Sequence, residues 1–187
     1  MSVNIMNTSK YSETQQIELA TAQAFFALYN AQHATFYVVN RVAGPNEVPD
    51  IFASDSNGCK FNLEITLTED RPGNIAALLG RSNSLSIEKL KQENEAVRAG
   101  KAQARINSLQ GNALPVLLDR IGKKLNKKYG IDTALVVRDT SFWDWEFVVP
   151  SIQTHLNSKA VVFDLGIWLL NAEKTAIFQL HAPKSAA

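Results

Sequence analysis

The sequence predicts an α/β fold in which a mixed central β-sheet is flanked by helices. Three observations support this prediction. A long amphipathic segment, residues 12–32, precedes a group of short strand-like segments. Within that group, residues 60–68 alternate between apolar and polar side chains, as a half-buried strand does. Farther along, the helical pattern 113–129 is followed by Gly130 and the apolar run 133–137, which is typical of a helix that returns to a buried strand.

The composition is that of an ordinary globular chain. Its 187 residues, of which 45% are hydrophobic, are enough to bury a sizeable core in one domain. The formal net charge is only +1, so no field of the whole molecule attracts nucleic acid or membranes, and a nuclease would need a local basic patch. The single cysteine, Cys59, excludes an intramolecular disulfide and argues against a cysteine-based zinc site.

We expect one domain over residues 1–187, with a flexible N-terminus at 1–11 and a flexible tail at 182–187. Residues 71–111 are expected to form a helical insertion between core elements. The first residues do not have the pattern of a signal peptide, and no apolar stretch approaches the length of a membrane span. These features predict a cytoplasmic protein.

The first helix has a clear start. Ser12 is placed as the N-cap and Gln15, three residues later, as its capping-box partner, so a helix to about Gln32 is predicted. Its buried stripe comprises Ile17, Ala20, Ala24, Phe25 and Leu28. Residues 36–43 are rich in β-forming side chains and predict the first strand, which Gly44-Pro45-Asn46 ends.

A hairpin is predicted next. Its strands are Val48–Ala53 and Cys59–Thr68, and its turn contains Asn57-Gly58, a pair that tolerates positive φ. Because side chains alternate along a strand, Glu64 and Thr66 point the same way, opposite to the apolar face. The apolar face comprises Phe61, Leu63, Ile65 and Leu67. Antiparallel pairing would bring Asp50 toward Glu64, and two such carboxylates suit a hard divalent cation such as Mg²⁺.

This pattern is similar to a known family. Pro49-Asp50, a gap, and Glu64-Ile65-Thr66 together resemble the motif of the PD-(D/E)XK superfamily, the restriction-endonuclease-like nucleases. The likeness covers about residues 12–70 and, more weakly, 113–181. It implies a restriction-endonuclease-like core with a helical insertion, which begins with a helix and three strands. It also implies Mg²⁺-dependent hydrolysis of phosphodiester bonds in nucleic acid.

The resemblance implies a role for each motif residue. Asp50 and Glu64 would hold Mg²⁺, with the backbone carbonyl of Ile65 as a further ligand. The family usually has a lysine at the position of Thr66, and a neutral hydroxyl cannot replace an ammonium group, although it can orient a water molecule. Two alternatives therefore stay open. One is a catalytically inactive nuclease-fold module that binds nucleic acid or a protein partner, and the other is an unrelated α/β protein with a small-ligand site.

In the resembled family, a helix before the core strands often supplies a glutamate to the metal site. Glu18 is the candidate here, and Glu13 is the alternate. The other interpretation of Glu18 is an exposed carboxylate that favours the first turns of the helix through its dipole.

Lysines are concentrated in the second half of the predicted helix Ala113–Tyr129. They are Lys123, Lys124, Lys127 and Lys128. One interpretation is a solvated face whose charges complement the C-terminus of the helix. Another is a ridge that binds nucleic-acid phosphates, in which Lys124 or Lys128 reaches inward to replace the lysine missing at Thr66. Nucleic acid is therefore the expected partner.

The remaining elements are a helix at 144–156, despite Pro150, and strands at 160–170 and 175–181. The mixed charges of the 85–110 helical region are typical of a solvated face, with a homo-oligomer or protein partner as the alternative. The sequence contains no Gly-rich phosphate loop, no dinucleotide fingerprint and no His spacing for zinc, which excludes several common classes of enzyme.

Overall fold

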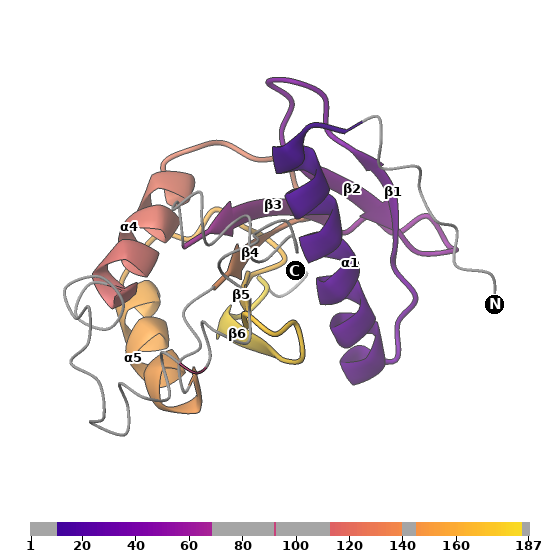
Figure 1. The fold of residues 1–187 in the computed structure, drawn as a ribbon. Coiled ribbons are helices and arrows are strands. Elements are labelled where there is room, and N and C mark those ends of the chain that lie inside the picture. Colours follow the sequence, from indigo (N-terminus) through magenta and orange to yellow (C-terminus); the bar gives the residue numbers. More distant parts are fainter. Residues whose placement is uncertain (1–10, 69–91, 93–112, 140–144, 185–187) are drawn as a thin grey trace.

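The computed structural model describes residues 11–68, 92, 113–139 and 145–184. These residues form a six-stranded mixed sheet packed against three helices, which confirms the predicted α/β class (Figure 1). In chain order the elements are α1 (Glu13–His33), β1 (Val38–Val42), β2 (Ile51–Ser54), β3 (Asn62–Leu67), α4 (Ala113–Leu125), β4 (Thr133–Arg138), α5 (Trp145–Asn157), β5 (Ile167–Leu170) and β6 (Ile177–His181).

The strands lie side by side in their sequence order, β1 to β6. β1, β2 and β3 are antiparallel, β3, β4 and β5 are parallel, and β6 is antiparallel to β5. The parallel strands occupy the centre and carry helices on both faces, which explains why β4 and β5 are apolar throughout most of their length. In Figure 1, α1 covers one face of the sheet, whereas α4 and α5 cover the other.

Two hydrophobic clusters result from this three-layer arrangement. The α1 cluster contains Phe25 of α1 and Leu63 of β3, and the α4–α5 cluster contains Ile121 of α4 and Ile152 of α5. β4 contributes to both clusters because its successive side chains point to opposite faces, with Val136 in the first and Leu135 in the second. The central sheet therefore joins the two clusters.

Local signals in the sequence match the structure at two places. Ser12 Oγ accepts a hydrogen bond from Gln15 N at 3.3 Å, and Gln15 Oε1 accepts one from Ser12 N at 3.0 Å, which confirms the predicted capping box. In the predicted hairpin turn, Gly58 has φ of 82°. Asp55 Oδ1 closes this turn because it accepts hydrogen bonds from the N–H groups of Asn57 and Cys59.

Other boundaries differ from the prediction. α4 ends at Leu125 rather than Tyr129, because the N–H of Lys127 bonds to the carbonyl of Lys124 in a turn, so Gly130 does not follow the helix directly. The strand predicted over 160–170 is confined to β5, and residues 160–166 form turns and irregular backbone. The remaining strands are also shorter than predicted, apart from β4, which extends one residue farther. Nearly all of the predicted helical insertion 71–111, including the 85–110 region, lies outside the described residues, as do most of the predicted flexible termini.

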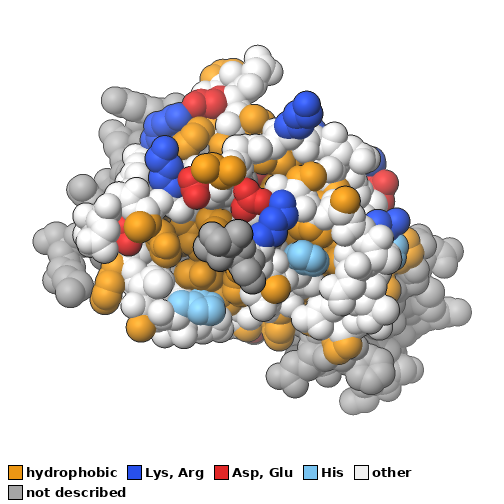
Figure 2. Space-filling view, turned by 180° about the vertical axis from the view of Figure 1, so that it is seen from behind, with side chains coloured by type: hydrophobic (Ala, Val, Ile, Leu, Met, Phe, Trp, Pro, Cys, Tyr) orange, Lys and Arg blue, Asp and Glu red, His pale blue; other side chains and the backbone are white. Residues whose placement is uncertain are grey.

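None of the helices that the structure describes combines the length and the apolar character needed to cross a membrane. On the face opposite to that of Figure 1, acidic and basic side chains are intermixed among apolar ones (Figure 2). Neither sign forms a continuous patch among the described residues seen there. This distribution agrees with the small net charge of the chain.

Candidate functional site

The carboxylate of Asp50 lies where β2 and β3 separate. These two strands share one registered pair, Ile51 with Leu63, and Asp50 is the residue before β2. Its Oδ2 accepts a hydrogen bond of 2.7 Å from the backbone N–H of Ile65. The side chain thus satisfies a β3 amide, and the bond fixes the carboxylate beside the β3 residue that follows Glu64.

The backbone of β3 places the carbonyl of Ile65 on the same side. The N–H groups of Asn62 and Thr68 donate to carbonyls of the β4 side at 2.8 and 3.2 Å. Because the peptide groups of a strand alternate in direction, those of Ile65 face away from β4, toward β2. The N–H of Ile65 meets Asp50 there, so its carbonyl also points toward that side.

Glu64 is buried, with 1% of its surface exposed. Its register partner on β4 is Leu135, a member of the α4–α5 cluster, so the side chain faces α4. One carboxylate oxygen, Oε1, accepts hydrogen bonds from Lys124 Nζ at 2.6 Å and from Tyr129 Oη at 3.2 Å. The other oxygen, Oε2, is buried and has no hydrogen-bond partner in the described part of the chain. An unsatisfied carboxylate oxygen at such a site is unusual in a folded protein.

Three carboxyl groups interact electrostatically here. Burial first, and then the charges of Asp50 and Glu64, together raise the pKa of Glu18 to about 7, against the opposing effect of Lys124. Burial first, and then the charge of Glu64, together raise the pKa of Asp50 to about 6. Hydrogen bonding by Ile65 and the charges of two lysines oppose that rise. Glu18 therefore lies within electrostatic reach of the predicted pair, whereas its alternate, Glu13, is exposed in the first turn of α1.

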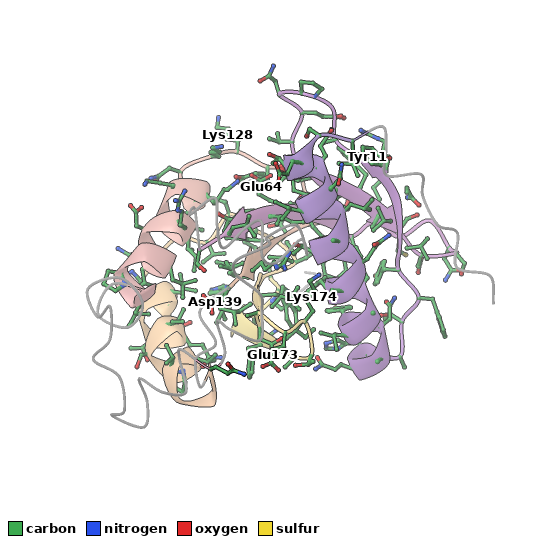
Figure 3. The ribbon with its side chains drawn as sticks, in the orientation of Figure 1. Tyr11, Glu64, Lys128, Asp139, Glu173 and Lys174 are labelled. Carbon is green, nitrogen blue, oxygen red and sulfur yellow. The ribbon has the colours of Figure 1, made fainter. Side chains whose placement is uncertain are left out.

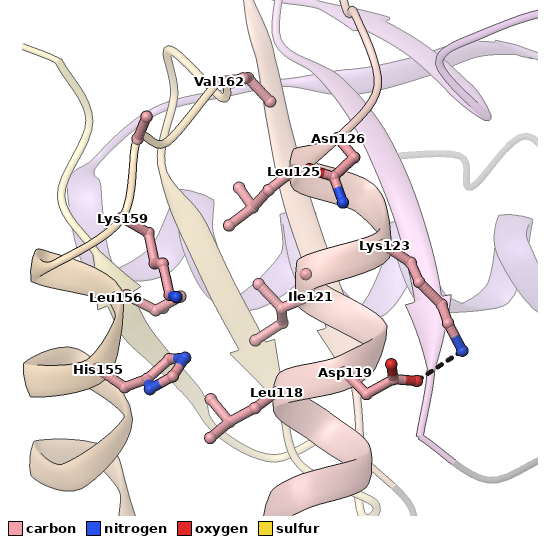
Figure 4. Close-up of a pocket in the computed structure, with 12 residues that line it drawn as sticks. Leu118, Asp119, Ile121, Lys123, Leu125, Asn126, His155, Leu156, Lys159 and Val162 are labelled. Atoms are coloured by element: carbon pink, nitrogen blue, oxygen red, sulfur yellow. Dashed lines mark ion pairs between the residues drawn. The ribbon is translucent and has the colours of Figure 1, made fainter.

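The lysines of the predicted basic ridge differ in position. Lys124 reaches inward, with 20% of its side chain exposed, and pairs with Glu64. Lys123 points outward, with 66% exposed, and pairs with Asp119 at 2.6 Å (Figure 4). Lys127 and Lys128 follow the end of α4 and are exposed.

Lys127 and Lys128 can each be located relative to the carboxylates of Asp50 and Glu64. The charge of Lys127 lowers the pKa of Asp50. Figure 3 shows Lys128 toward the same end of the molecule as Glu64, and Asp139 away from that end.

Thr66 is buried and lies on the same face of β3 as Glu64, because its register partner on β4 is Val137, a member of the α4–α5 cluster.

Tyr129 is the residue of this site that the sequence did not predict. The sequence predicts this residue at the end of the helix, but the earlier end of α4 allows its ring to pack on Phe163, with 4.6 Å between the ring centroids. Burial and the charge of Glu64 raise the pKa of its phenol, so the hydroxyl is a neutral donor to Glu64. A tyrosine next to lysines and a glycine was the only sequence signal, and it does not indicate a partner.

The oxygen atoms of Asp50, Glu64 and Ile65 are the atoms at this site that could coordinate a metal ion. The described residues contain no group of three or more His, Cys, Asp or Glu side chains that could hold a metal. Mg²⁺, however, is commonly held by one or two carboxylates while it keeps several waters. The unpartnered Oε2 of Glu64, the carboxylate of Asp50 and the carbonyl side of Ile65 fit this smaller requirement.

Comparisons of the chain with protein-family models, with curated proteins and with solved structures find no match.

Proposed function

We propose that this protein is a divergent Mg²⁺-dependent nuclease-like protein, similar to the PD-(D/E)XK superfamily, that hydrolyses phosphodiester bonds in nucleic acid. One observation carries the proposal. Glu64 Oε2 is buried without a hydrogen-bond partner among the described residues, next to the strand residue that binds Asp50. A cation between these carboxylates would satisfy the oxygen and relieve the repulsion that contributes to the raised pKa of Asp50.

The order of the elements supports the same proposal. A helix, α1, precedes three strands, β1 to β3, and the mixed sheet has helices on both faces. This is the arrangement expected at the front of a restriction-endonuclease-like core. Glu64 lies on β3, and Asp50 is the residue directly before β2 rather than inside that strand.

In this proposal, Asp50, Glu64 and the carbonyl of Ile65 hold Mg²⁺. The bound ion supplies positive charge that lowers the pKa of a water molecule and offsets charge on the scissile phosphate. Lys124, at 2.6 Å from Glu64, supplies the ammonium group that Thr66 lacks. Thr66 orients the attacking water through its hydroxyl, and Glu18 completes the site through water.

Nucleic acid is the proposed partner, bound by lysines beside the carboxylates. Lys127 and Lys128 are exposed, and the charge of Lys127 is felt at Asp50, so this end of the molecule offers cations to a phosphate backbone. Lys123 is paired with Asp119, which makes it the weaker contributor. Because these contacts are electrostatic, affinity should decrease as the salt concentration rises.

The alternative is an inactive nuclease-fold module that binds nucleic acid or a protein partner. The observation in its favour is the ion pair between Lys124 and Glu64, because it balances the buried carboxylate without a metal ion. Such a module would keep the exposed lysines and would not depend on Mg²⁺.

The two functions differ in their response to Mg²⁺. We expect Asp50→Asn and Glu64→Gln each to abolish Mg²⁺-dependent cleavage of DNA or RNA, because each removes an anionic ligand while side-chain size is kept. Mg²⁺ should raise the melting temperature of the wild type and not of these variants, since only the wild type binds it. Cleavage assays with single- and double-stranded substrates and thermal melts with and without Mg²⁺ measure both effects.

Asp119→Asn is the matched control, because it removes an exposed carboxylate from α4 and should leave both responses intact. If the wild type shows neither cleavage nor a Mg²⁺-dependent melting shift, the enzyme proposal is wrong. Salt-sensitive nucleic-acid binding by that same inactive protein would then favour the binding module.

A further inference from the structure

A groove of about 550 Å³ lies between α4 and α5, and its lining does not include Asp50, Glu64 or Lys124 (Figure 4). Its volume is within the range of small-molecule sites, and the space between helices is a common place for them. We propose that this groove binds an apolar carboxylate, that is, a small molecule with a hydrophobic body and one anionic end. The proposal is independent of the nuclease-like function.

The floor of the groove is the hydrophobic core itself. Ile121 of α4 and Leu156 of α5 are buried, and Leu118, Leu125 and Val162 are partly buried around them. All five belong to the α4–α5 cluster or pack against it. A hydrophobic ligand body in the groove would therefore extend the core and remove further apolar surface from water.

Gly122 is a second, independent observation at the same place. It lies inside α4, where glycine destabilises a helix relative to alanine, and it lines the groove. A Cβ atom at this position would meet no atom within 4 Å, so close packing does not require glycine. Its φ is not in the left-handed region either, so the backbone does not require it. The absence of a side chain at Gly122 leaves space beside the apolar floor of the groove.

The polar side chains at the rim select the ligand. His155 and Lys159 are exposed on the α5 side, and both side chains extend toward the gap (Figure 4). On the α4 side, the charges of Lys123 and Asp119 balance one another in an ion pair. The described residues provide no carboxylate partner for Lys159 within ion-pair distance, which leaves its positive charge for an anionic group of a ligand. The combination of apolar floor and cationic rim matches an apolar carboxylate.

The test uses 2-naphthoate and decanoate as probes, with 2-methylnaphthalene and decanol as neutral analogues. We expect saturable binding of the carboxylates to the full-length protein by calorimetric titration, and weaker binding of the neutral analogues. Gly122→Leu should fill the groove and reduce carboxylate affinity by at least about tenfold, since a leucine side chain competes for the apolar floor. Its helical circular dichroism should not decrease, because a Cβ atom at this position meets no atom within 4 Å and leucine favours a helix more than glycine does.

Gly122→Ala is the matched variant, which adds one methyl group and should retain most of the binding. Lys159→Ala should weaken carboxylate binding by up to about fivefold without affecting the neutral analogues, in line with the strength of exposed charge pairs. Lys184→Ala, which removes a lysine paired with Asp164 outside the groove, should have no effect. The proposal is overturned if neither carboxylate binds saturably, if the neutral analogues bind equally well, or if binding is the same in Gly122→Leu and Lys159→Ala as in the wild type.

Discussion

Glu64 is a carboxylate on a strand that is buried on both faces, and its surroundings determine what the buried charge costs. Burial of a carboxylate without partners is strongly unfavourable, and Lys124 and Tyr129 offset that cost at one oxygen only. The second oxygen has no such compensation among the described residues. This asymmetry distinguishes Glu64 from a residue kept only for stability, because an apolar side chain would fill the same space without an unsatisfied atom.

Glu18 provides a pH-dependent test of the site. Its pKa is raised to about 7 in the folded protein, so between about pH 5 and pH 7 the folded state binds more protons than the unfolded state. The free energy of unfolding should therefore decrease as pH rises through this interval. The part of the slope that Glu18 contributes should be below about 1.4 kcal/mol per pH unit, because half-exposed Glu18 is partly screened by water. Asp50, whose pKa is raised to about 6, contributes to the part that remains in Glu18→Gln. Urea unfolding at several pH values should show this decrease for the wild type and a smaller one for Glu18→Gln.

Glu47 is the control for that measurement. Its hydrogen bond with Arg41 lowers its pKa to about 2, so its contribution is present above the unfolded pKa and is lost only as pH falls toward 2. The stability difference between wild type and Glu47→Gln should thus be constant from about pH 5 upward. Equal pH profiles for Glu18→Gln and the wild type would show that the pKa of Glu18 is not raised in the folded protein.

At the scale of elements, α4 and the turn after it determine how the site is completed. The helix ends at Leu125, and Lys124, in its last turn, contacts Glu64. The chain then turns so that Tyr129 reaches the same oxygen. An inward-reaching lysine at position 124 or 128 could be predicted, because helical periodicity places both at the margin of the apolar stripe. That stripe comprises Leu114, Leu117, Leu118, Ile121 and Leu125. The position of Tyr129 could not be predicted, because it depends on a helix end that no glycine or proline marks at Leu125.

Lys123 and Lys124 are adjacent lysines with different surroundings, and they form a matched pair for mutation. Lys124→Met should lower the free energy of unfolding by about 1–3 kcal/mol, because it leaves Glu64 buried without its cation. Lys123→Met should change it by no more than about 0.5 kcal/mol, since its pair with Asp119 is exposed. Chemical denaturation measures both.

The same variants bear on the metal proposal. If Mg²⁺ binds at Glu64, it should stabilise Lys124→Met more than the wild type, because the ion then replaces the missing ammonium charge. An equal Mg²⁺-dependent shift in melting temperature for Lys124→Met, Lys123→Met and wild type would argue against a metal at Glu64.

At the scale of the whole molecule, the central sheet should make the two hydrophobic clusters unfold together. Leu63 belongs to the α1 cluster and Leu135 to the α4–α5 cluster, and both are fully buried on neighbouring strands. Leu63→Ala and Leu135→Ala should each cost about 2–5 kcal/mol and lower the temperature of one shared transition in calorimetry. Two separate transitions, each moved by only one variant, would instead indicate two independent domains.

The sequence predicts those parts of the fold that depend on interactions between residues close together in the chain. The capping box at Ser12 and the turn at Gly58 depend on residues close in sequence. The alternation along β3 is that of a half-buried strand, whereas β3 is buried on both faces because α4 covers its polar side. Arg138 illustrates what such signals cannot provide. An arginine after an apolar run usually marks the exposed end of a strand, yet Arg138 is 1% exposed and donates a hydrogen bond to Thr21 of α1 at 3.3 Å. Its burial depends on a helix more than half the chain away.

The parallel pairing of β3 with β4 also determines the order in which the site can be assembled. β3 ends at Leu67 and β4 begins at Thr133, so pairing these strands closes a long loop. Loop closure costs chain entropy, and that cost slows folding. α1, β1, β2 and β3 are joined by short connections and can associate earlier. The three carboxyl groups come from this early half, whereas the ammonium and phenol groups that hold Glu64 come from the late half. The slow closure of the chain is therefore also the step at which the negative charges of the site gain their counter-charge.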